Sequence, residues 1–371
     1  MSLQHLKLRG FRNLASLDID VPAGVTLLLG SNGAGKSNLL EAIAVLGNLI
    51  SFRQGPPTAW VQRGAEGFTL EGIVERSGTP VLLVQSARLR GTLLRTLHRG
   101  ARRLDAAEYL DLFPVAAFSS HDRQLVWGAP EDRRRFLDRF TFQLHPETLL
   151  VLQRYRRALR QRNALLQGTG TDEQLAAFEH DLASLGARLT HLRLQAIAEL
   201  EPALQGELGE LGWSLSRLNL RYHCPDGELA GDPVATAARL AARLARMRRV
   251  ERARGHTMVG PHRHDLQLAV SGQPARDTVS AGQGKLLATA LKLAALAVAT
   301  RVRGAQPTVV FDDVDAELDA GVLQRVLGRL AHGGQLLLSS AHDEVVVPRV
   351  RADGVWRIAD GVLAPAAPVR E

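Results

Sequence analysis

The chain has 371 residues, of which 45% are hydrophobic, so it can bury one large core or two ordinary ones. Its formal net charge of +8 favours a polyanionic partner such as nucleic acid, although an anionic membrane surface or simple solubility also fits. The single cysteine, Cys224, excludes an internal disulfide framework and a cysteine-based metal site. We therefore expect a globular protein of the cytoplasm.

The N-terminal residues alternate apolar and polar side chains, unlike a targeting segment, in which a charged region precedes an apolar one. The longest apolar run, residues 286–300, is shorter than the roughly 20 residues that span a bilayer, and it contains Lys292. We expect this run to be a buried helix, and we expect no membrane partner.

In several parts of the first hundred residues, apolar and polar side chains alternate with the two-residue period of a β-strand. Leu6 and Leu8 alternate with polar residues, and residues 25–29 form a continuous apolar run. Residues 68–97 contain short alternating runs that glycines interrupt. We expect this last segment to form an antiparallel meander.

Residues 130–255 change to leucine and alanine at helical spacing, with almost no β-branched runs. A heptad seam extends from Leu175 to Ala196, and a shorter one from Leu152 to Leu166 precedes the turn-forming residues 168–172. Two helices joined by such a turn should fold back as an antiparallel pair. An ordinary helical bundle that does not protrude is the alternative.

Strands and helices alternate again after residue 255. Strands are expected at 266–270, 308–311 and 335–339, and helices from residue 286 and over 320–330. This order favours an α/β nucleotide-binding layer that a helical insertion interrupts. We predict an N-terminal part of the nucleotide-binding domain at 1–120, the helical insertion at 121–259 and a C-terminal part at 260–371.

A complete phosphate-binding loop follows the apolar strand at 25–29 and precedes a helical segment. Its glycines let successive backbone N–H groups surround phosphate oxygens, and the helix N-terminus adds partial positive charge. Lys36 should reach the β- and γ-phosphates, and Ser37 should coordinate Mg²⁺. Lys36 is also one of only four lysines among 46 basic residues, so its position is unlikely to be accidental. The loop residues expected to bind ATP are Gly30, Ser31, Asn32, Gly33, Ala34, Gly35, Lys36 and Ser37.

Residues 308–311 form a short apolar strand that ends in two carboxylates. Asp312 should hold Mg²⁺ through water, and Asp313 should orient or deprotonate the attacking water as a catalytic residue beside Lys36. A strand that acidic turn residues simply cap is the alternative, and the phosphate-binding loop argues against it.

Ser280, Gly282 and Gln283 precede the apolar helix and form a second helix N-terminus suited to phosphate. Small polar residues before a helix are also ordinary caps, so the position of this segment between the insertion and Asp312 is what favours a function. The segment resembles the signature loop of ABC ATPases. Three later residues resemble the D-loop and the switch histidine of that superfamily: Glu317, Asp319 and His342.

Further segments, which cover most of the chain, resemble the bacterial RecF family of SMC-like ABC proteins. They are Gly10-Phe11-Arg12-Asn13, Asn38 to Ile43, Ser51-Phe52-Arg53, Pro130 to Asp138, Gln161 to Leu166 and Gly260 to Arg263. The last three are not general ABC motifs. They separate this family from transporter ATPases and from SMC heads, whose long coiled coils are missing here.

The resemblance implies an ABC-type head with an antiparallel β subdomain, interrupted by a helical insertion like a short SMC coiled coil. It implies binding of ATP and Mg²⁺, with Arg12 at the ATP site, and a head-to-tail homodimer around two nucleotides. Family members bind double-stranded DNA or its junction with single strands, and they work with RecO and RecR to help RecA load at gaps. These roles belong to replication, recombination, DNA repair and the SOS response, and the ATPase is slow and DNA-stimulated.

Two residues depart from the family pattern. His264 stands where an acidic residue is expected. Asp313 replaces the general ABC catalytic glutamate with a side chain one methylene shorter. We interpret Asp313 as compatible with slow hydrolysis.

In ABC folds the phosphate-binding loop and the signature loop lie on different edges of one head. The resemblance therefore implies that a second copy supplies Ser280 and Gly282 to the nucleotide held by Lys36. Two other functions stay open: a small-molecule kinase, which leaves the signature-like segment without a role, and a DNA clamp in which hydrolysis is incidental. The basic charge and the helical insertion disfavour a transporter ATPase.

Arginine clusters at Arg133–Arg135, Arg156–Arg162 and Arg239–Arg254 are candidates for contacts with DNA phosphates. Solvated helix faces are the alternative for each cluster. His262 and His264 lie two residues apart without supporting cysteines, which disfavours a metal site.

Overall fold

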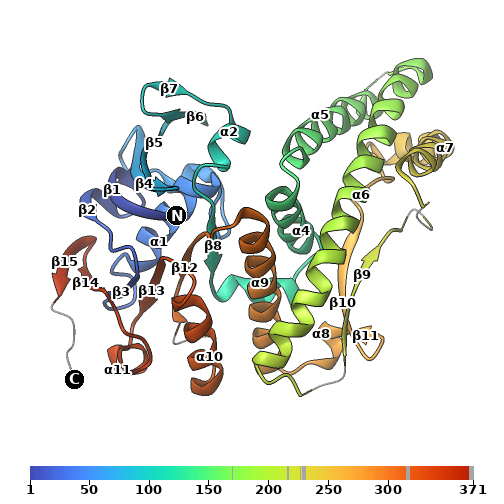
Figure 1. Cartoon of the computed structure of the whole chain (residues 1–371). Helices are drawn as coiled ribbons and strands as arrows, with labels where there is room; N and C mark the ends of the chain where they lie inside the picture. Colours follow the sequence, from blue (N-terminus) through green and yellow to red (C-terminus); the bar gives the residue numbers. More distant parts are fainter. Residues whose placement is uncertain (169, 215–216, 226, 228–230, 315–317, 367–371) are drawn as a thin grey trace. The chain divides into compact units, whose positions relative to one another are not determined.

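The computed structural model describes residues 1–168, 170–214, 217–225, 227, 231–314 and 318–366 (Figure 1). The chain divides into two compact units. Unit 1 comprises residues 1–123, 207–213 and 281–371, and unit 2 comprises 124–206 and 214–280. The domain division predicted at residues 120 and 259 stays a prediction. Within the described residues, no helix combines the length and the apolar character that crossing a membrane requires.

A six-stranded sheet in unit 1 carries the phosphate-binding loop. Its order is β15-β14-β3-β13-β12-β8, and all neighbouring pairs are parallel except β14 with β15. The strands are β3 (Val25–Leu29), β8 (Val115–Phe118), β12 (Thr308–Phe311), β13 (Leu336–Ser340), β14 (Gly354–Ala359) and β15 (Val362–Ala366). Because the carboxyl ends of parallel strands meet at one edge, the residues that follow β3, β12 and β13 come together.

The second six-stranded sheet of unit 1 is antiparallel, in the order β2-β1-β4-β5-β6-β7. Its strands are β1 (Ser2–Phe11), β2 (Leu14–Asp20), β4 (Gly67–Arg76), β5 (Thr79–Arg90), β6 (Thr92–Arg99) and β7 (Arg102–Arg103). The meander predicted for residues 68–97 is β4-β5-β6, so that prediction is confirmed.

Helix α1 (Lys36–Asn48) packs between the two sheets. Its Leu39 and Ile43 belong to the same apolar cluster as Leu6 of β1 and Leu337 of β13. A helix that is apolar on nearly all sides is stable only when both faces are covered. The other helices of unit 1 are η1 (Pro57–Trp60), α2 (Ala106–Leu110), η2 (Ser120–Arg123), α9 (Ala281–Arg303), α10 (Ala320–Ala331), α11 (Asp343–Val346) and η4 (Val347–Arg349).

The helices of unit 2 include the predicted antiparallel pair. Helices α5 (Thr148–Gln167) and α6 (Asp172–Glu210) lie side by side (Figure 1), and the last residues of α6 belong to unit 1. Leu152 shares an apolar cluster with Leu189, and Ala158 shares one with Ala183, so the helices run in opposite directions. The pair is confirmed. The remaining helices are α3 (Gln124–Trp127), α4 (Pro130–Leu144), α7 (Pro233–Arg254) and α8 (Ala275–Thr278).

Unit 2 also contains a three-stranded sheet, in the order β11-β10-β9, that corrects two predictions. Strand β9 (Leu218–His223) interrupts the region predicted to be wholly helical. Strand β10 (Asp265–Val270) pairs with β9 and with β11 (Gln273–Pro274), and is not part of the nucleotide-binding layer. The predictions were wrong because β9 is short, and a strand that far from its partner in sequence is defined by tertiary pairing.

Candidate nucleotide-binding site

The phosphate-binding loop connects β3 to α1, and its curvature depends on glycine. Gly30, Gly33 and Gly35 have φ angles of 154°, 85° and 122°, which residues with a Cβ rarely adopt. Gly30 also lies against β14, where a Cβ would be 2.4 Å from the carbonyl oxygen of Ile358. The loop conformation therefore requires the glycine spacing of the motif.

Lys36 begins α1 and points back into the loop. Its side chain is buried, and Nζ donates to the carbonyl oxygens of Gly30 at 2.7 Å and Ser31 at 3.1 Å. Gly35 is the N-cap of α1 and has no side chain to accept from the first-turn N–H groups. Backbone N–H groups at a helix N-terminus, together with an ammonium group, form a site for phosphate oxygens.

Asp312 and Ser37 lie together beside this loop. Asp312 follows β12 and is 7% exposed, and its Oδ1 accepts from Ser339 Oγ at 2.7 Å. Burial raises the pKa of Asp312 and the Asp313 carboxylate raises it further, whereas hydrogen bonds from Ser339 and Ser37 act in the opposite direction. Hydroxyl and carboxylate oxygens are ligands that suit Mg²⁺, so this set of donors fits that ion.

Asp313 has a strained backbone. Its φ angle is 49°, and its N–H donates to Ser339 Oγ at 2.8 Å. Ser339 therefore links the backbone of Asp313 to the carboxylate of Asp312. The sequence analysis did not propose Ser339, although its place at the end of a strand parallel to β12 was a usable signal. Strained non-glycine residues of this kind concentrate at functional sites.

Two segments of the sequence, one around Arg12 and one around Arg53, converge on α1 behind the loop. Arg12 donates to the buried Glu41 from Nε at 3.0 Å and from Nη2 at 2.7 Å. Arg53 Nη1 donates to Asn38 Oδ1 at 2.7 Å, and Asn38 Nδ2 donates to Asn13 Oδ1 at the same distance. The guanidinium of Arg12 thus neutralises Glu41, and its predicted role at the ATP site stays a prediction.

The signature-like segment lies at the start of α9. Ser280 and Gly282 are exposed, and Gln283 is half-buried. Further along α9, Lys292 Nζ lies 2.7 Å from both Asp122 carboxylate oxygens, donates to the carbonyl oxygen of Ala117 and lies 4.9 Å from the centre of the Phe118 ring. These contacts attach α9 to β8 and η2.

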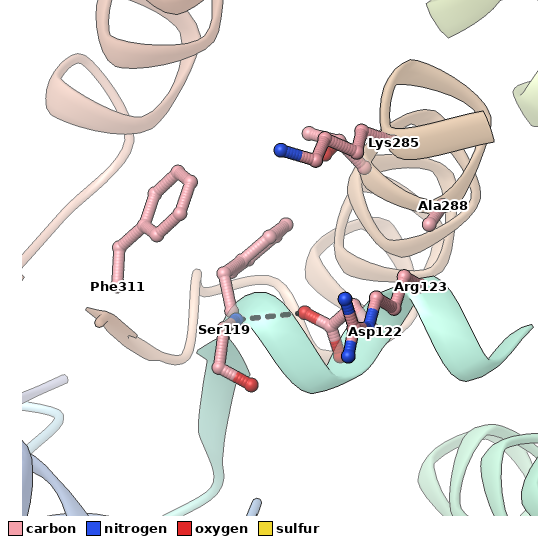
Figure 2. A pocket seen from close by; sticks show the side chains of 8 residues that line it. Ser119, Asp122, Arg123, Lys285, Ala288 and Phe311 are labelled. Carbon is pink, nitrogen blue, oxygen red and sulfur yellow. Dashed lines mark hydrogen bonds between the residues drawn. The ribbon is translucent and has the colours of Figure 1, made fainter. Parts of the chain in front are cut away.

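A small pocket lies between α9 and the ends of β8 and β12. Figure 2 shows Lys285 and Ala288 of α9 on one side, with Ser119 and Phe311 on the other. Its volume of about 10 Å³ is sufficient for about one water molecule, so it cannot hold a nucleotide. The lining residues are Phe118, Ser119, Asp122, Arg123, Lys285, Ala288, Thr289 and Phe311.

The attachment of α9 separates it from the strand that carries the phosphate-binding loop. Strands β12 and β13 lie between β8 and β3 in the sheet. With neighbouring strands about 4.8 Å apart, β8 lies about 14 Å from β3. The helix that begins next to Ser280 is therefore attached at the β8 edge of the sheet, three strands from β3.

The other residues that the sequence predicted for the site are Asp319, His342 and Glu317, and they lie in different surroundings. Asp319 is the N-cap of α10, and its carboxylate accepts from the N–H groups of Gly321 and Val322 at 3.0 Å each. His342 is exposed after β13, and its backbone N–H donates to Ser340 Oγ at 3.0 Å. Glu317 lies outside the described residues. The D-loop and switch roles of these residues stay predictions.

The arginines proposed to contact DNA differ in how far they are buried. Arg133 is buried and donates to both Asp265 carboxylate oxygens at 2.9 and 2.8 Å. Arg162 is 0% exposed and lies 3.0 Å from Glu179 and 2.7 Å from Glu251. The proposal is wrong for these two, because their guanidinium groups are committed to internal ion pairs. Exposed arginines in the three clusters are Arg135, Arg156, Arg157, Arg160, Arg239, Arg246, Arg249 and Arg254.

Sequence comparison assigns the chain to a known family. The family described as RecF/RecN/SMC N terminal domain matches residues 2–362. A protein from Synechococcus sp. (strain JA-3-3Ab), named DNA replication and repair protein RecF, is 36% identical over 350 residues, which is 92% of each chain. The protein of the same name from Anaeromyxobacter dehalogenans (strain 2CP-C) is 36% identical over 373 residues, with 98% of this chain and 99% of the relative covered.

Comparison with solved structures supports the same family. A solved structure described as the recombination mediator protein RecF-ATP in the RecFOR pathway has a TM-score of 0.90 and 26% identity, and covers 99% of this chain and 98% of that chain. An SMC head bound to the C-winged helix domain of ScpA has a TM-score of 0.56 at 14% identity and covers 99% and 97%, so it shares the fold alone. The predicted ABC-type head is confirmed. The loop, the sheet and these matches together show that the chain belongs to the RecF family.

Proposed function

We propose that this protein is an ATP-binding and ATP-hydrolysing switch that acts on DNA in replication and recombinational repair. The observation that carries the proposal is the convergence of the phosphate-binding loop, Ser37 and Asp312 at one edge of the parallel sheet. The names of the relatives, which describe replication and repair, and the ATP in the description of the RecF structure support it.

The residues of the site have distinct roles in this proposal. The loop N–H groups and Lys36 bind the phosphates, while Ser37 and Asp312 hold Mg²⁺, which neutralises phosphate charge when it is bound. Asp313 orients the attacking water. Because its side chain is short and its backbone is held by Ser339, we expect the water to be poorly positioned and hydrolysis to be slow.

The site is completed by a second copy of the chain. We expect Ser280, Gly282 and Gln283 of one copy to meet the γ-phosphate that Lys36 of the other copy binds. The attachment of α9 to the β8 edge supports this arrangement, because it places the helix that follows the segment three strands from β3, which carries the loop. Hydrolysis then removes the phosphate that joins the copies, and the dimer separates.

DNA is the proposed partner of the ATP-bound dimer. The net charge of +8 and the exposed arginines support contacts with backbone phosphates, which give weak sequence preference and strong salt dependence. By family membership we also propose duplex DNA and single-strand junctions as targets, RecO and RecR as partners, RecA loading as the outcome and the cytoplasm as the location.

A DNA clamp that uses ATP only as a conformational ligand is the second candidate. The short side chain of Asp313 favours it, because a poorly placed water makes hydrolysis incidental to the switch. The variant Asp313→Asn separates the two candidates. It should keep ATP-dependent dimers in both, and it should block release of DNA only where hydrolysis resets the switch.

Sedimentation velocity of the purified protein with labelled duplex DNA tests the proposal. The measurement is made with and without ATP and Mg²⁺, at several salt concentrations. We expect dimer mass and salt-sensitive DNA binding to increase together when ATP is added. A monomer that ignores ATP, or DNA affinity that ATP leaves unchanged, would contradict the proposal.

A further inference from the structure

The end of β13 lies between the strand that leads into the phosphate-binding loop and the strand that leads to Asp312. Ser339 pairs with Leu28 of β3 on one side. On the other side Leu338 pairs with Phe311 of β12, so Ser339 lies beside Asp312. Ser339 is 0% exposed. The sheet register therefore places one buried hydroxyl inside the proposed nucleotide site.

The hydroxyl of Ser339 both donates and accepts a hydrogen bond. Its Oγ donates to Oδ1 of Asp312 at 2.7 Å, and it accepts from the backbone N–H of Asp313 at 2.8 Å. The carboxylate of Asp312 is also hydrogen-bonded to Ser37, the second residue of α1. One hydroxyl thus connects the proposed metal ligand to the backbone of the residue proposed to orient the attacking water.

The backbone of Asp313 explains why an aspartate occupies this position. Its φ angle of 49° lies in the left-handed region, which is unfavourable for residues with a Cβ. Aspartate adopts this region more readily than most residues, because its short polar side chain hydrogen-bonds locally. The left-handed conformation thus favours aspartate over the glutamate of other ABC proteins, and the hydrogen bond to Ser339 stabilises that conformation.

We propose that Ser339 is a positioning residue for ATP hydrolysis, which holds the backbone of Asp313 so that the carboxylate keeps one orientation towards the attacking water. This role rests on the proposed function, in which Asp313 orients that water. Without the hydroxyl, the N–H of Asp313 loses its acceptor and the strained φ angle loses its restraint. The carboxylate then samples other orientations, and a displacement of about 1 Å can cost about a hundredfold in rate.

Two variants of Ser339 test this role. Ser339→Ala removes the hydroxyl, and Ser339→Thr keeps it. Steady-state kinetics with Mg²⁺ give kcat and KM, and isothermal titration gives the affinity for ATP. We expect Ser339→Ala to lower kcat by about tenfold or more and to change the affinity by less than about threefold. Ser339→Thr should recover most of the rate.

Thr308→Val is the matched control for loss of a buried hydroxyl. Thr308 begins β12, is 0% exposed, and donates from Oγ1 to Oε1 of Gln335 at 3.0 Å. It lies at the opposite end of the strand from Asp312. The control should lower the melting temperature about as much as Ser339→Ala does, and it should keep the wild-type kcat. Thermal melts of all the variants verify that each one is folded.

A double variant shows whether Ser339 acts through Asp313. In the Asp313→Asn background, Ser339→Ala should change the residual rate by less than about twofold, because the carboxylate that the hydroxyl positions is gone. Wild-type kcat in folded Ser339→Ala, or a tenfold loss that persists in the Asp313→Asn background, overturns the positioning role and leaves the proposed function intact. A wild-type protein that binds ATP without hydrolysing it also overturns the role, and one that binds no ATP contradicts the proposed function as well.

Discussion

Buried carboxylates have different surroundings in the two units. In unit 2, the carboxylates of Glu179 and Glu251 meet the buried guanidinium of Arg162 at 3.0 and 2.7 Å. In unit 1, the carboxylate of Asp312 accepts from the hydroxyl of Ser339 and lies close to a second carboxylate.

The two surroundings shift the pKa values of Glu179 and Asp312 in opposite directions. Burial opposes ionisation of Glu179, but hydrogen bonds from Arg248 and Arg162 outweigh it and lower its pKa. Burial and Asp313 raise the pKa of Asp312. A carboxylate that arginines neutralise is a structural element, whereas a buried one that hydroxyls and a second carboxylate surround has a place for a cation. The comparison thus separates the framework of unit 2 from the chemistry of unit 1.

The largest expected effect is in the framework. Replacing Arg162 by methionine leaves Glu179 and Glu251 buried near each other without this cation, which should cost about 3 to 5 kcal/mol of unfolding free energy. Arg157→Met, an exposed change on the same helix, is the matched control and should cost less than about 0.5 kcal/mol. Chemical denaturation measures both, and equal losses would show that the buried pair is not structural.

Lys36→Ala tests the chemistry of unit 1. Loss of the charged hydrogen bonds to phosphate should weaken ATP binding by about 100-fold, or about 3 kcal/mol. Loss of the hydrogen bonds to Gly30 and Ser31 should cost only about 1 kcal/mol of stability in the absence of nucleotide. Isothermal titration with ATP and Mg²⁺ gives the affinity. Lys7→Ala, a control at a half-buried lysine of β1 that pairs with Asp18, should bind like the wild type. A Lys36→Ala chain that also binds like the wild type would contradict the assignment of the loop as the phosphate site.

Asp312→Asn should have a smaller effect, and it should stabilise the metal-free protein, whereas the Arg162 variant is destabilised. A raised pKa means that the stability this group contributes is present below 3.8 and is lost as pH rises through the folded pKa, so the ionised carboxylate destabilises the protein at neutral pH. The amide should therefore raise the metal-free stability at neutral pH and abolish the extra stability given by Mg²⁺ with ATP. Thermal melts at pH 7 test both parts, and a variant that keeps the Mg²⁺ response contradicts the assignment of the metal site.

The smallest effect is the pH dependence of Glu179. Because its folded pKa lies below the unfolded value of 4.5, its stabilisation is present above pH 4.5 and is lost as pH falls through the folded pKa. Glu179→Gln should lose less stability between neutral and acidic pH than the wild type does. Urea denaturation at both ends of this range compares them, and parallel losses would mean that other groups dominate.

Local patterns predicted what depends on neighbours in sequence. The strand, glycine loop and helix around Lys36, the meander and the antiparallel helices were all correct, because each requires only short-range periodicity. Strand β9 was missed because its partner β10 is far along the chain.

Side-chain partners from distant segments were equally invisible. Ser339 bridges Asp312 and Asp313 only once β12 and β13 are paired, and Arg12 meets Glu41 only once α1 lies against β1. The arginine clusters gave the same difficulty, since burial decides between an ion pair at Arg162 and an exposed guanidinium at Arg157. The sequence pattern alone contains no measure of burial at this level.

The central claim is that each nucleotide site needs two copies of the chain. Mixing Lys36→Ala protein with Ser280→Arg protein tests it most directly, because each variant alone lacks one half of both sites. Heterodimers should contain one intact site, so an equal mixture should recover about a quarter of wild-type ATPase activity, since about half of the dimers are mixed. If Ser280→Arg alone hydrolyses ATP normally, or if the mixture stays inactive although sedimentation shows mixed dimers, the two-copy site is contradicted.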